Sequence, residues 1–315
     1  MMFSTDVEIL IAPFTPMHGD ESIHYQLIES LFDYYTTLGV KGVFINGTTG
    51  ECMSLSTEER MLILEEWVKA KNQQLKNPFD LFAHVGSCNL KESVRMAEHA
   101  ESLGINGVAM VSPFYFKPGS VRELVSQCAF VASAAPKTPF YYYNIPYYTG
   151  VQFPLLEFCK LAYKKIPNFA GIKSSHNNTT EYLQCMLFAK NKFTMYWGID
   201  ENFINLYAAG NISFIGSTYN YMLPIYQKMV EAFKQKKQKK FFWMQKTAFK
   251  IYDVLSKYEG IPAGKEMMSF IGLDCGPVRL PLKKIDLSEK ENILKALTKS
   301  GYFNHVKSFM APVNS

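Results

Sequence analysis

The sequence lacks the features that mark secreted, metal-binding or membrane-spanning chains. Its 315 residues hold six cysteines, scattered without a CxxC pair and without a histidine spacing suited to zinc. No stretch approaches the ~20 apolar residues that cross a bilayer, and the first residues, Met-Met-Phe-Ser-Thr-Asp-Val-Glu, lack the order of a secretory signal. These absences predict a cytoplasmic protein with reduced thiols, no bound metal and no membrane partner.

Signatures for binding nucleotides and nucleic acids are missing too. After the first expected strand the chain reads Pro13-Phe14-Thr15-Pro16, which is neither a GxGxxG turn nor a P-loop. The net charge is +5, but much of the excess comes from one lysine-rich run at 234–240. That run follows a segment of helical period, so we expect a solvated helix end, where cations suit the dipole, and no nucleic-acid partner.

What the sequence does contain is a regular alternation of short apolar runs with segments of helical period. The eight runs are 7–13, 42–46, 80–85, 107–112, 140–144, 169–174, 193–198 and 212–217. The clearest helix follows the capping box Ser56-Thr57-Glu58-Glu59, with Met61, Leu64 and Val68 as its apolar stripe. This alternation predicts an α/β fold, a (β/α)8 TIM barrel, in preference to an open doubly wound sheet.

Further helical patterns follow the eighth run, at 221–237, 240–258 and 288–298. No linker rich in Pro, Gly or Ser separates them from the rest of the chain. We therefore expect residues 1–220 to form the barrel strands and helices, and residues 221–315 to form the last barrel helix and a C-terminal helical extension. The two parts should pack as one structural unit.

Lys173 ends an apolar run, Phe-Ala-Gly-Ile-Lys-Ser-Ser (169–175), that reads as a buried strand. Strand alternation places Gly171, Lys173 and Ser175 on one face, with Ala170 and Ile172 on the other. An ammonium is rarely left at the mouth of an apolar strand unless it is paired or used chemically. Desolvation favours the neutral amine, the nucleophile that forms Schiff bases with carbonyl compounds. The plainer alternative is a lysine that begins a surface loop.

A turn rich in glycine and hydroxyl groups follows the second expected strand. It reads Asn46-Gly47-Thr48-Thr49-Gly50-Glu51. Its backbone N–H groups and the hydroxyls of Thr48 and Thr49 can converge on an anion. We expect a carboxylate, because no lysine accompanies the turn as it would in a phosphate loop. The alternative is an ordinary turn whose hydroxyls cap backbone groups.

Tyrosines at two other strand ends are candidates for proton transfer. In the run Phe140-Tyr141-Tyr142-Tyr143-Asn144, Tyr143 lies at the end and shares a face with Tyr141. A phenol with a pKa near ~10 shuttles protons only when it is linked to other hydroxyls. Thr48, and Tyr115 after the fourth strand, are candidates for that link. An aromatic strand that only packs in the core is the alternative.

The last two strand ends carry carboxylates and hydroxyls. They read Trp197-Gly198-Ile199-Asp200-Glu201 and Ile215-Gly216-Ser217-Thr218-Tyr219-Asn220. At the carboxyl edge of a barrel, such groups can accept hydrogen bonds from a polyhydroxylated substrate. Alternatively, Asp200 and Glu201 interact with the dipole of the following helix. No third carboxylate or histidine completes a metal site.

Together these groups suit a 2-oxo acid with a polar tail. The amine attacks the ketone, and the resulting iminium draws electrons from the neighbouring carbon–carbon bond. That electron sink needs no cofactor.

Five motifs, in this order along the chain, resemble the class I pyruvate-dependent aldolases, the family that includes N-acetylneuraminate lyase and dihydrodipicolinate synthase. They are Gly-Thr-Thr-Gly-Glu (47–51), Tyr-Tyr-Asn-Ile-Pro (142–146), Gly-Ile-Lys (171–173), Gly-Ile-Asp-Glu (198–201) and Gly-Ser-Thr-Tyr-Asn (216–220), within a similarity that spans about residues 7–300. Tyr147-Tyr148-Thr149-Gly150 lacks the arginine that dihydrodipicolinate synthases usually carry there, which favours the N-acetylneuraminate lyase branch.

The resemblance implies that Lys173 forms the Schiff base and that Tyr143 is the acid/base. It also implies that Thr48 and Thr49 bind the 2-oxo acid carboxylate. Tyr115 would be lent between neighbouring subunits of a homo-oligomer, commonly a tetramer in this family. The residues implied to line the sugar pocket are Ser175, Gly198, Asp200, Glu201, Gly216 and Ser217.

The implied reaction is the reversible cleavage of N-acetylneuraminate, a sialic acid, to N-acetylmannosamine and pyruvate. Aldolases that act on aspartate semialdehyde or on 2-keto-3-deoxy sugar acids are alternatives. A non-catalytic protein that binds a 2-oxo acid or sialic acid is an alternative of another class. Members of the family vary where this chain has Ser174-Ser175-His176, and His176 is either a pocket residue or a solvent-facing loop residue.

Overall fold

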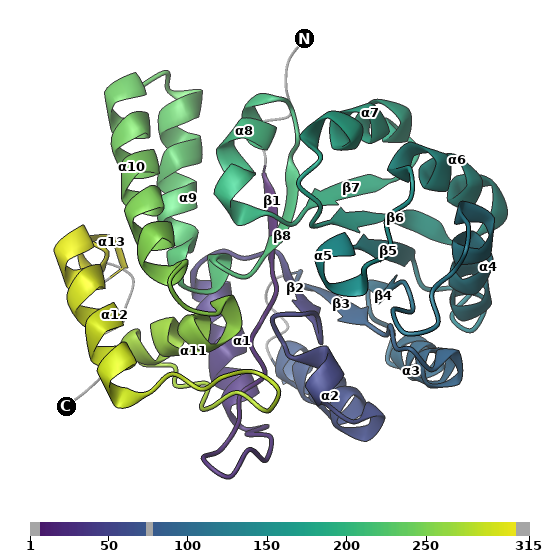
Figure 1. Ribbon diagram of the computed structural model, residues 1–315, viewed down its shortest axis with the longest axis horizontal. Coiled ribbons are helices and arrows are strands. Elements are labelled where there is room, and N and C mark those ends of the chain that lie inside the picture. The colour runs from purple at the N-terminus through teal and green to yellow at the C-terminus, as the bar shows by residue number, and fades with distance from the viewer. Residues whose placement is uncertain (1–6, 74–77, 307–315) are drawn as a thin grey trace.

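Eight parallel strands close into a barrel in chain order, which confirms the predicted (β/α)8 architecture (Figure 1). The structure is a computed structural model that describes residues 7–73 and 78–306. Each strand lies within two residues of its predicted limits. The strands are β1 (Glu8–Ile11), β2 (Gly42–Ile45), β3 (Asp80–His84), β4 (Gly107–Val111), β5 (Phe140–Asn144), β6 (Phe169–Ser174), β7 (Thr194–Trp197) and β8 (Ser213–Gly216).

Helices connect the strands and cover the outside of the barrel. They are α1 (Leu27–Thr37), α2 (Thr57–Gln73), α3 (Leu90–Ser102), α4 (Val121–Ala132), α6 (Leu155–Lys165), α7 (Thr179–Ala189) and α8 (Phe203–Ala208). Short turns of helix, η1 (Cys52–Ser54), α5 (Pro146–Thr149) and η2 (Asp200–Asn202), follow three of the strands. These three segments shape the carboxyl edge of the barrel, where parallel strands present their functional groups.

Helix α2 begins at the predicted capping box and packs its predicted apolar stripe against the core. The Ser56 hydroxyl accepts from the Glu59 N–H at 3.1 Å, and the Glu59 carboxylate accepts from the Ser56 N–H at 2.9 Å. Leu64 of the predicted stripe is buried, and Met61 and Val68 are half-buried against the same core. Ile63 and Trp67, which the stripe did not include, are buried beside Leu64.

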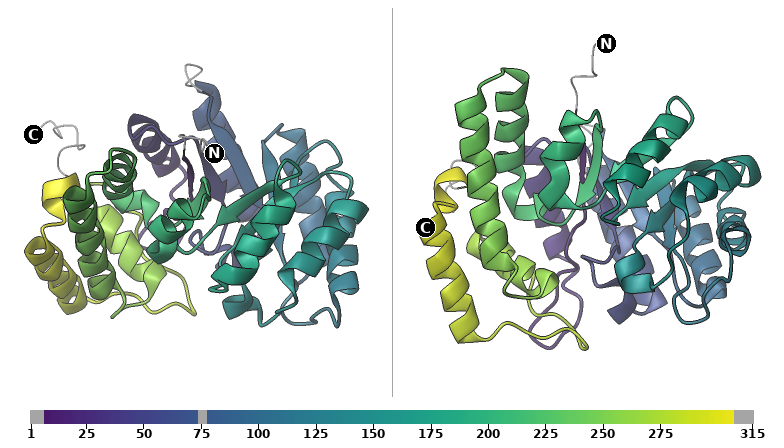
Figure 2. Two further views of the ribbon diagram at one scale, coloured as in Figure 1. Left: turned by 90° about the horizontal axis from the view of Figure 1, so that it is seen from above. Right: turned by 45° about the horizontal axis from the view of Figure 1, so that its top comes forward.

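Within the described residues, five further helices follow the last strand and form a layer along one side of the barrel (Figures 1 and 2). They are α9 (Tyr219–Lys234), α10 (Gln238–Leu255), α11 (Gly260–Phe270), α12 (Leu287–Ser300) and α13 (Phe303–Val306). The sequence patterns did not predict α11, because its first five residues include Gly260, Pro262 and Gly264. Pro262 is tolerated there, since the first turn of a helix needs no N–H partner. A side chain at Gly264 would collide with Phe14, since a Cβ would lie 2.3 Å from its ring.

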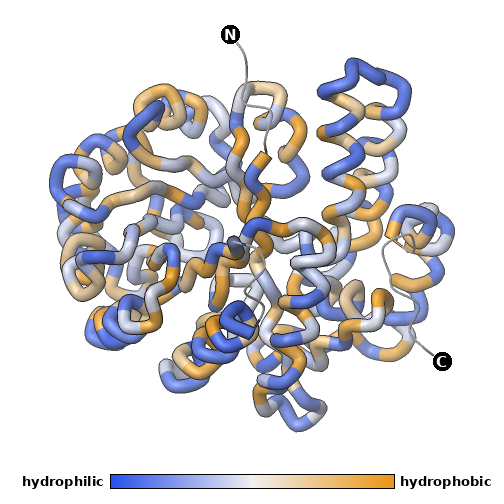
Figure 3. Tube along the Cα trace, turned by 180° about the vertical axis from the view of Figure 1, so that it is seen from behind, coloured by the Kyte–Doolittle hydropathy of each residue, from blue (hydrophilic) through white to orange (hydrophobic). Residues whose placement is uncertain are grey.

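The lysine-rich run covers the last residue of α9, the turn after it and the first three residues of α10. Residues 234–240 are all exposed, as predicted, and the turn is hydrophilic (blue in Figure 3). Within residues 7–73 and 78–306, every helix is too short or too polar to cross a bilayer.

A bulge in β6 changes which side chains face the barrel interior. Phe140 pairs with Phe169, but the next pair along is Tyr141 with Gly171, so that Ala170 is an extra residue. Ala170 therefore packs against the interior cluster together with Tyr141, whereas Ile172 packs outside, against the helices. The prediction that Ala170 and Ile172 share a face was wrong, because regular alternation does not hold across a bulge.

Candidate active site

Lys173 lies inside the barrel, near the carboxyl end of β6. Its side chain is buried, and Nζ lies 4.0 Å from the ring centroid of Tyr143 and 4.3 Å from that of Phe44. Tyr143 is brought there by strand pairing, because it is the β5 residue opposite Lys173. Sequence reasoning did not select Phe44, although its place in β2, one residue before the strand end, could have indicated that it lines the interior.

The glycine-rich turn 46–51 lies beside this lysine. The hydroxyls of Thr48 and Tyr143 are 3.3 Å apart, while Thr49 is buried within the turn. The Thr15 hydroxyl donates to the carbonyl of Gly50 at 2.7 Å, which attaches the turn to the loop after β1. The structure thus brings together Lys173, Tyr143 and the threonine turn, from three different strand ends.

Both ends of the turn have left-handed backbone conformations that are uncommon for residues with side chains. Asn46 has φ 56° and Glu51 has φ 57°. The Asn46 amide donates to the carbonyl of Arg60 at 2.8 Å, and the Glu51 carboxylate is buried. Such conformations persist only where the surroundings hold them in place.

A buried histidine and arginine hold the Asn46 end and were not predicted. His84 packs edge-on against Tyr143, with ring centroids 6.0 Å apart. Its Nε2 accepts from the N–H of Val111 at 3.3 Å, and its Nδ1 lies 3.0 Å from the Asn46 carbonyl. Burial, followed by the charges of Arg60 and Lys173, lowers the pKa of His84 well below its usual value, so the ring is neutral.

Asp200 lies at the end of β7 and is buried, so it does not point freely into solvent. Its Oδ2 accepts from the N–H and hydroxyl of Thr218 at 2.8 and 2.7 Å, while Oδ1 has no hydrogen-bond partner among the described residues. Burial, with a contribution from Glu201, raises the pKa of Asp200 to about 7, against the Thr218 hydrogen bonds and the charge of Lys173. A Cβ at Gly216 would lie 1.7 Å from Oδ1, so the carboxyl group packs directly on this glycine.

The other predicted pocket residues lie around the same edge with different exposures. The Ser175 hydroxyl donates to the carbonyl of Gly198 at 3.1 Å. A Cβ at Gly198 would lie 2.3 Å from that hydroxyl and 3.3 Å from Cε of Lys173, so the glycine leaves space beside the amine. Ser217 is half-buried and Glu201 is exposed.

Tyr115 does not join the hydroxyl pair of Thr48 and Tyr143 within the described chain. It is 77% exposed, and its ring packs edge-on against that of Phe116 with centroids 5.0 Å apart. The loop that carries these rings also places Lys117 Nζ 3.4 Å from the carbonyl of Gly150. A cation therefore does lie beside the segment 147–150, although the segment itself has none. His176 is half-buried.

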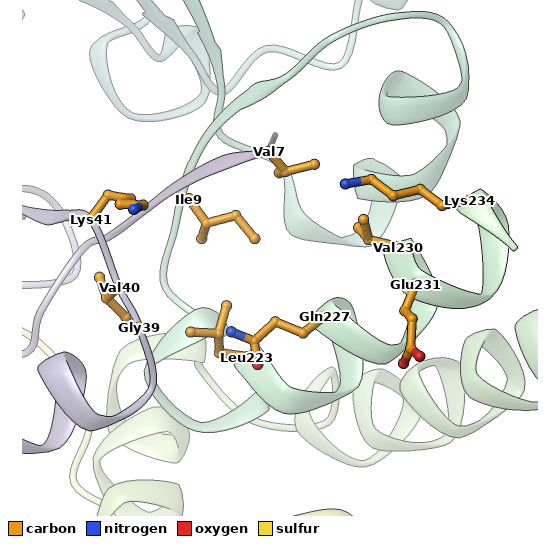
Figure 4. A pocket seen from close by; sticks show the side chains of 10 residues that line it. All are labelled: Val7, Ile9, Gly39, Val40, Lys41, Leu223, Gln227, Val230, Glu231 and Lys234. Carbon is orange, nitrogen blue, oxygen red and sulfur yellow. The ribbon is translucent and has the colours of Figure 1, made fainter. Parts of the chain in front are cut away.

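A hollow elsewhere in the structure is lined by two lysines but by no tyrosine or threonine. It has a volume of about 500 Å³ and lies between the amino end of β1 and α9, with Lys41 and Lys234 on opposite sides (Figure 4). Its walls are mostly apolar, including Ile9 and Leu223. Within the described residues no three His, Cys, Asp or Glu side chains gather as metal ligands would.

The geometry is suited to covalent carbonyl chemistry. A buried primary amine lies against a phenol, the phenol lies beside a threonine hydroxyl, and the threonine belongs to a glycine-rich turn. A carboxylate that accepts hydroxyl donors occupies a neighbouring strand end. An amine so placed can attack a carbonyl carbon while the phenol moves a proton.

Comparisons with known proteins point to one family. Residues 6–300 match the profile of the Dihydrodipicolinate synthetase family. The chain is 38% identical over 281 residues to N-acetylneuraminate lyase of Rattus norvegicus, covering 88% of this chain and 87% of the relative. The solved structure of Proteus mirabilis N-acetylneuraminate lyase superposes with a TM-score of 0.89 at 32% identity, covering 94% of this chain and 99% of that one. A Ruminococcus gnavus sialic acid aldolase, described as a catalytic lysine mutant, superposes with a TM-score of 0.86 at 26% identity, covering 98% of each chain.

Proposed function

This chain belongs to the dihydrodipicolinate synthetase family, and from that premise we propose that it is a Schiff-base aldolase that reversibly cleaves N-acetylneuraminate to N-acetylmannosamine and pyruvate. The proposal is supported by relatives of high coverage that carry the name N-acetylneuraminate lyase. It rests most directly on one observation, the position of Lys173 Nζ against the ring of Tyr143.

Lys173 is the nucleophile of the proposed reaction. Its amine attacks the C2 ketone of the open-chain sugar acid, and loss of water leaves an iminium. The threonine turn binds the carboxylate at C1 through N–H and hydroxyl groups, which fixes the ketone against Nζ. The rings of Phe44 and Tyr143 flank the amine, and they favour the cationic iminium that forms.

Tyr143 is the proposed acid/base. It gives its proton to the water that leaves when the iminium forms. The resulting phenolate then removes the proton from the C4 hydroxyl while the C3–C4 bond breaks, and the bonding electrons pass into the iminium to give an enamine. N-acetylmannosamine leaves as the aldehyde. Protonation of the enamine at C3 and hydrolysis of the iminium release pyruvate and restore the amine. The hydroxyl of Thr48, 3.3 Å from that of Tyr143, stabilises the phenolate form through a hydrogen bond.

Residues at the ends of β6, β7 and β8 bind the hydroxylated tail in this proposal. Asp200 and Glu201 accept hydrogen bonds from sugar hydroxyls, and Ser175 and Ser217 supply neutral hydroxyls. Gly198 leaves space beside the amine, and Gly216 leaves space for the carboxyl group of Asp200.

Reductive trapping tests the proposal. The protein is incubated with pyruvate and borohydride, digested, and analysed by mass spectrometry. We expect a reduced pyruvyl adduct on Lys173, no adduct in Lys173→Ala, and a normal adduct in Lys165→Ala, which removes an exposed lysine at the end of α6. Absence of the adduct from the unmodified protein would remove the mechanism.

A substrate panel separates the related aldolases. Pyruvate is supplied with N-acetylmannosamine, with aspartate semialdehyde, or with aldehydes that give 2-keto-3-deoxy sugar acids, and condensation is followed. The panel must include aspartate semialdehyde, which carries a carboxylate. Segment 147–150 has no cation of its own to bind that group, but Lys117 places one beside it. Release of pyruvate from N-acetylneuraminate excludes a purely binding role.

We also propose a cytoplasmic homotetramer. All six cysteines lie in the described part of the chain and are free, as expected in a reducing compartment. Tyr115, Phe116 and Tyr147 are each more than three-quarters exposed near the barrel mouth, and exposed apolar side chains of this size are typical of subunit contacts. Sedimentation analysis of the purified protein tests the assembly.

A further inference from the structure

A buried ion pair joins the C-terminal extension to the glycine-rich turn of the site. Nζ of Lys265, on α11, lies 2.6 Å from Oε1 of Glu51, and the two side chains are 2% and 0% exposed. Lys265 also donates to the carbonyl of Pro277 at 2.6 Å. The extension therefore contacts the end of the turn that carries Thr48 and Thr49.

A second residue of the extension strengthens this contact. The backbone N–H of Arg279 donates to the other carboxylate oxygen of Glu51 at 3.0 Å. Its guanidinium binds both carboxylate oxygens of Glu59, at 2.6 and 2.8 Å, and the carbonyl of Ser54 at 3.1 Å. The segment 265–279 thus holds the turn and the start of α2 in one arrangement.

The turn needs such support because its backbone is strained at Glu51. A left-handed φ of 57° is unfavourable for a glutamate, and it persists only where contacts over-determine it. Glu51 lies two residues after Thr49, and its N–H donates to the carbonyl of Thr48 at 3.0 Å. A relaxation at Glu51 would therefore move the threonine hydroxyls relative to Tyr143.

Fold stability alone is a weak reason for such a pair. Two charges taken out of water lose much of their Coulomb attraction to desolvation, and apolar replacements are often as stable. Burial accordingly lowers the pKa of Lys265, even though Glu51 opposes that shift. What the pair supplies is a fixed direction for the Glu51 side chain.

We propose that Glu51 and Lys265 are positioning residues, through which the C-terminal extension sets the geometry of the carboxylate-binding turn. The inference rests on the proposed function, because the turn is taken to bind the carboxylate of a 2-oxo acid. Neither residue touches the reacting atoms. Without the pair, the turn should still form but should hold its hydroxyls less accurately, and misplacement by about 1 Å can cost about 10²-fold in rate.

Three variants test the proposal. Lys265→Met leaves the Glu51 carboxylate buried and unpaired. The double variant Glu51→Gln with Lys265→Met removes both charges and retains an acceptor for the Arg279 N–H. The control, Lys290→Met, removes another ion pair of the extension, with Glu266 at 2.6 Å, which does not contact the turn. For each folded protein, isolated by gel filtration, we measure melting temperature and the pyruvate concentration that gives half-maximal borohydride trapping on Lys173.

The double variant decides the question. We expect it to regain much of the melting temperature lost in Lys265→Met, while its half-saturating pyruvate concentration stays about tenfold or more above that of the unmodified protein. Lys290→Met should bind pyruvate normally. A double variant with unchanged half-saturation would overturn the positioning role, since it would show that the pair serves the fold alone. If the unmodified protein gives no adduct at all, the proposed function fails instead.

Discussion

The amine of Lys173 and the ring of Tyr143 are in direct contact, with Nζ 4.0 Å from the ring centroid, and the two residues are strand partners in β6 and β5. The contact uses the face of the ring, whereas the hydroxyl of Tyr143 lies 3.3 Å from Thr48. The Tyr143 side chain therefore has two separable roles. Its ring packs against the amine, and its hydroxyl can carry a proton.

Tyr143→Phe separates these roles. The phenyl ring keeps the contact with the amine, so we expect pyruvate trapping on Lys173 to continue. Turnover of N-acetylneuraminate should fall by about 10²–10⁴-fold, since the acid/base hydroxyl is lost. Tyr142→Phe is the matched control, because Tyr142 is buried on the outer face of the same strand, against Phe158. Equal losses in the two variants would contradict the assignment.

Thr48→Val removes the hydroxyl beside Tyr143 with little change in shape. We expect kcat/KM to fall by about 10–100-fold, equivalent to about 1–3 kcal/mol for a lost hydrogen bond to a charged group. Steady-state kinetics measure the effect. The control Thr180→Val, at an exposed position on α7, should leave kcat and KM unchanged. A fully active Thr48→Val enzyme would exclude this hydroxyl from the site.

Asp200 predicts a specific dependence of stability on pH. Its folded-state pKa of about 7 lies above the ordinary value of 3.8, so the unfolded chain loses the proton first and the free energy of unfolding falls as pH rises between these values. Asp200→Asn should remove this pH-dependent decrease in the free energy of unfolding, which is on the order of 4 kcal/mol above pH 7. Denaturant melts at pH 4 and pH 8 measure the difference from the unmodified protein.

Asp253→Asn, at an exposed position on α10, should leave the pH dependence unchanged. If the free energy of unfolding changes by the same amount between pH 4 and pH 8 in Asp200→Asn and in the unmodified protein, the prediction is wrong. Asp200 would then be ionised over this whole pH range.

Gly216→Ala tests the packing of the same carboxyl group. The new Cβ would lie 1.7 Å from Oδ1 of Asp200, so the side chain must move and its bonds to Thr218 must weaken. We expect a destabilisation of about 1–3 kcal/mol together with a higher KM for the sugar acid. Gly19→Ala, where nothing lies within 4 Å of the added Cβ, should be nearly neutral in both measurements.

Tyr115 predicts complementation between subunits. If neighbouring subunits lend this tyrosine to one another, Tyr115→Phe should be slow and Lys173→Ala should be inactive. Refolding the two variants together should restore activity, because some sites then combine an intact Lys173 with an intact Tyr115. No gain over the separate variants would place Tyr115 outside the site.

The barrel was predictable because its signal is local. Eight apolar runs bounded by polar residues indicate strands whatever lies around them, and strand ends then point to Lys173, Tyr143 and Thr48. No local pattern indicates the roles of His84 and Lys265, because their partners are far away in sequence. His84 contacts Asn46, and Lys265 pairs with Glu51. The bulge at Ala170 and the helix that begins at Gly260 were missed for the same reason, since tertiary packing overrides alternation and propensity. The roles of the pocket residues, and the division of the chain at residue 220, stay predictions.

The extra residue in β6 has a consequence for anyone who transplants or redesigns this nucleophile. After the bulge, regular pairing with β5 resumes at Gly171, opposite Tyr141. The direction of the Lys173 side chain therefore depends on Gly171 and Ile172, and hardly on the residues before the bulge. Shortening the strand by deleting Ala170 should leave the amine aimed at the cavity. A deletion or insertion of one residue between Gly171 and Lys173 would turn the lysine side chain outward, toward the helices. The barrel would still fold, but it would have no amine in its interior to form a Schiff base.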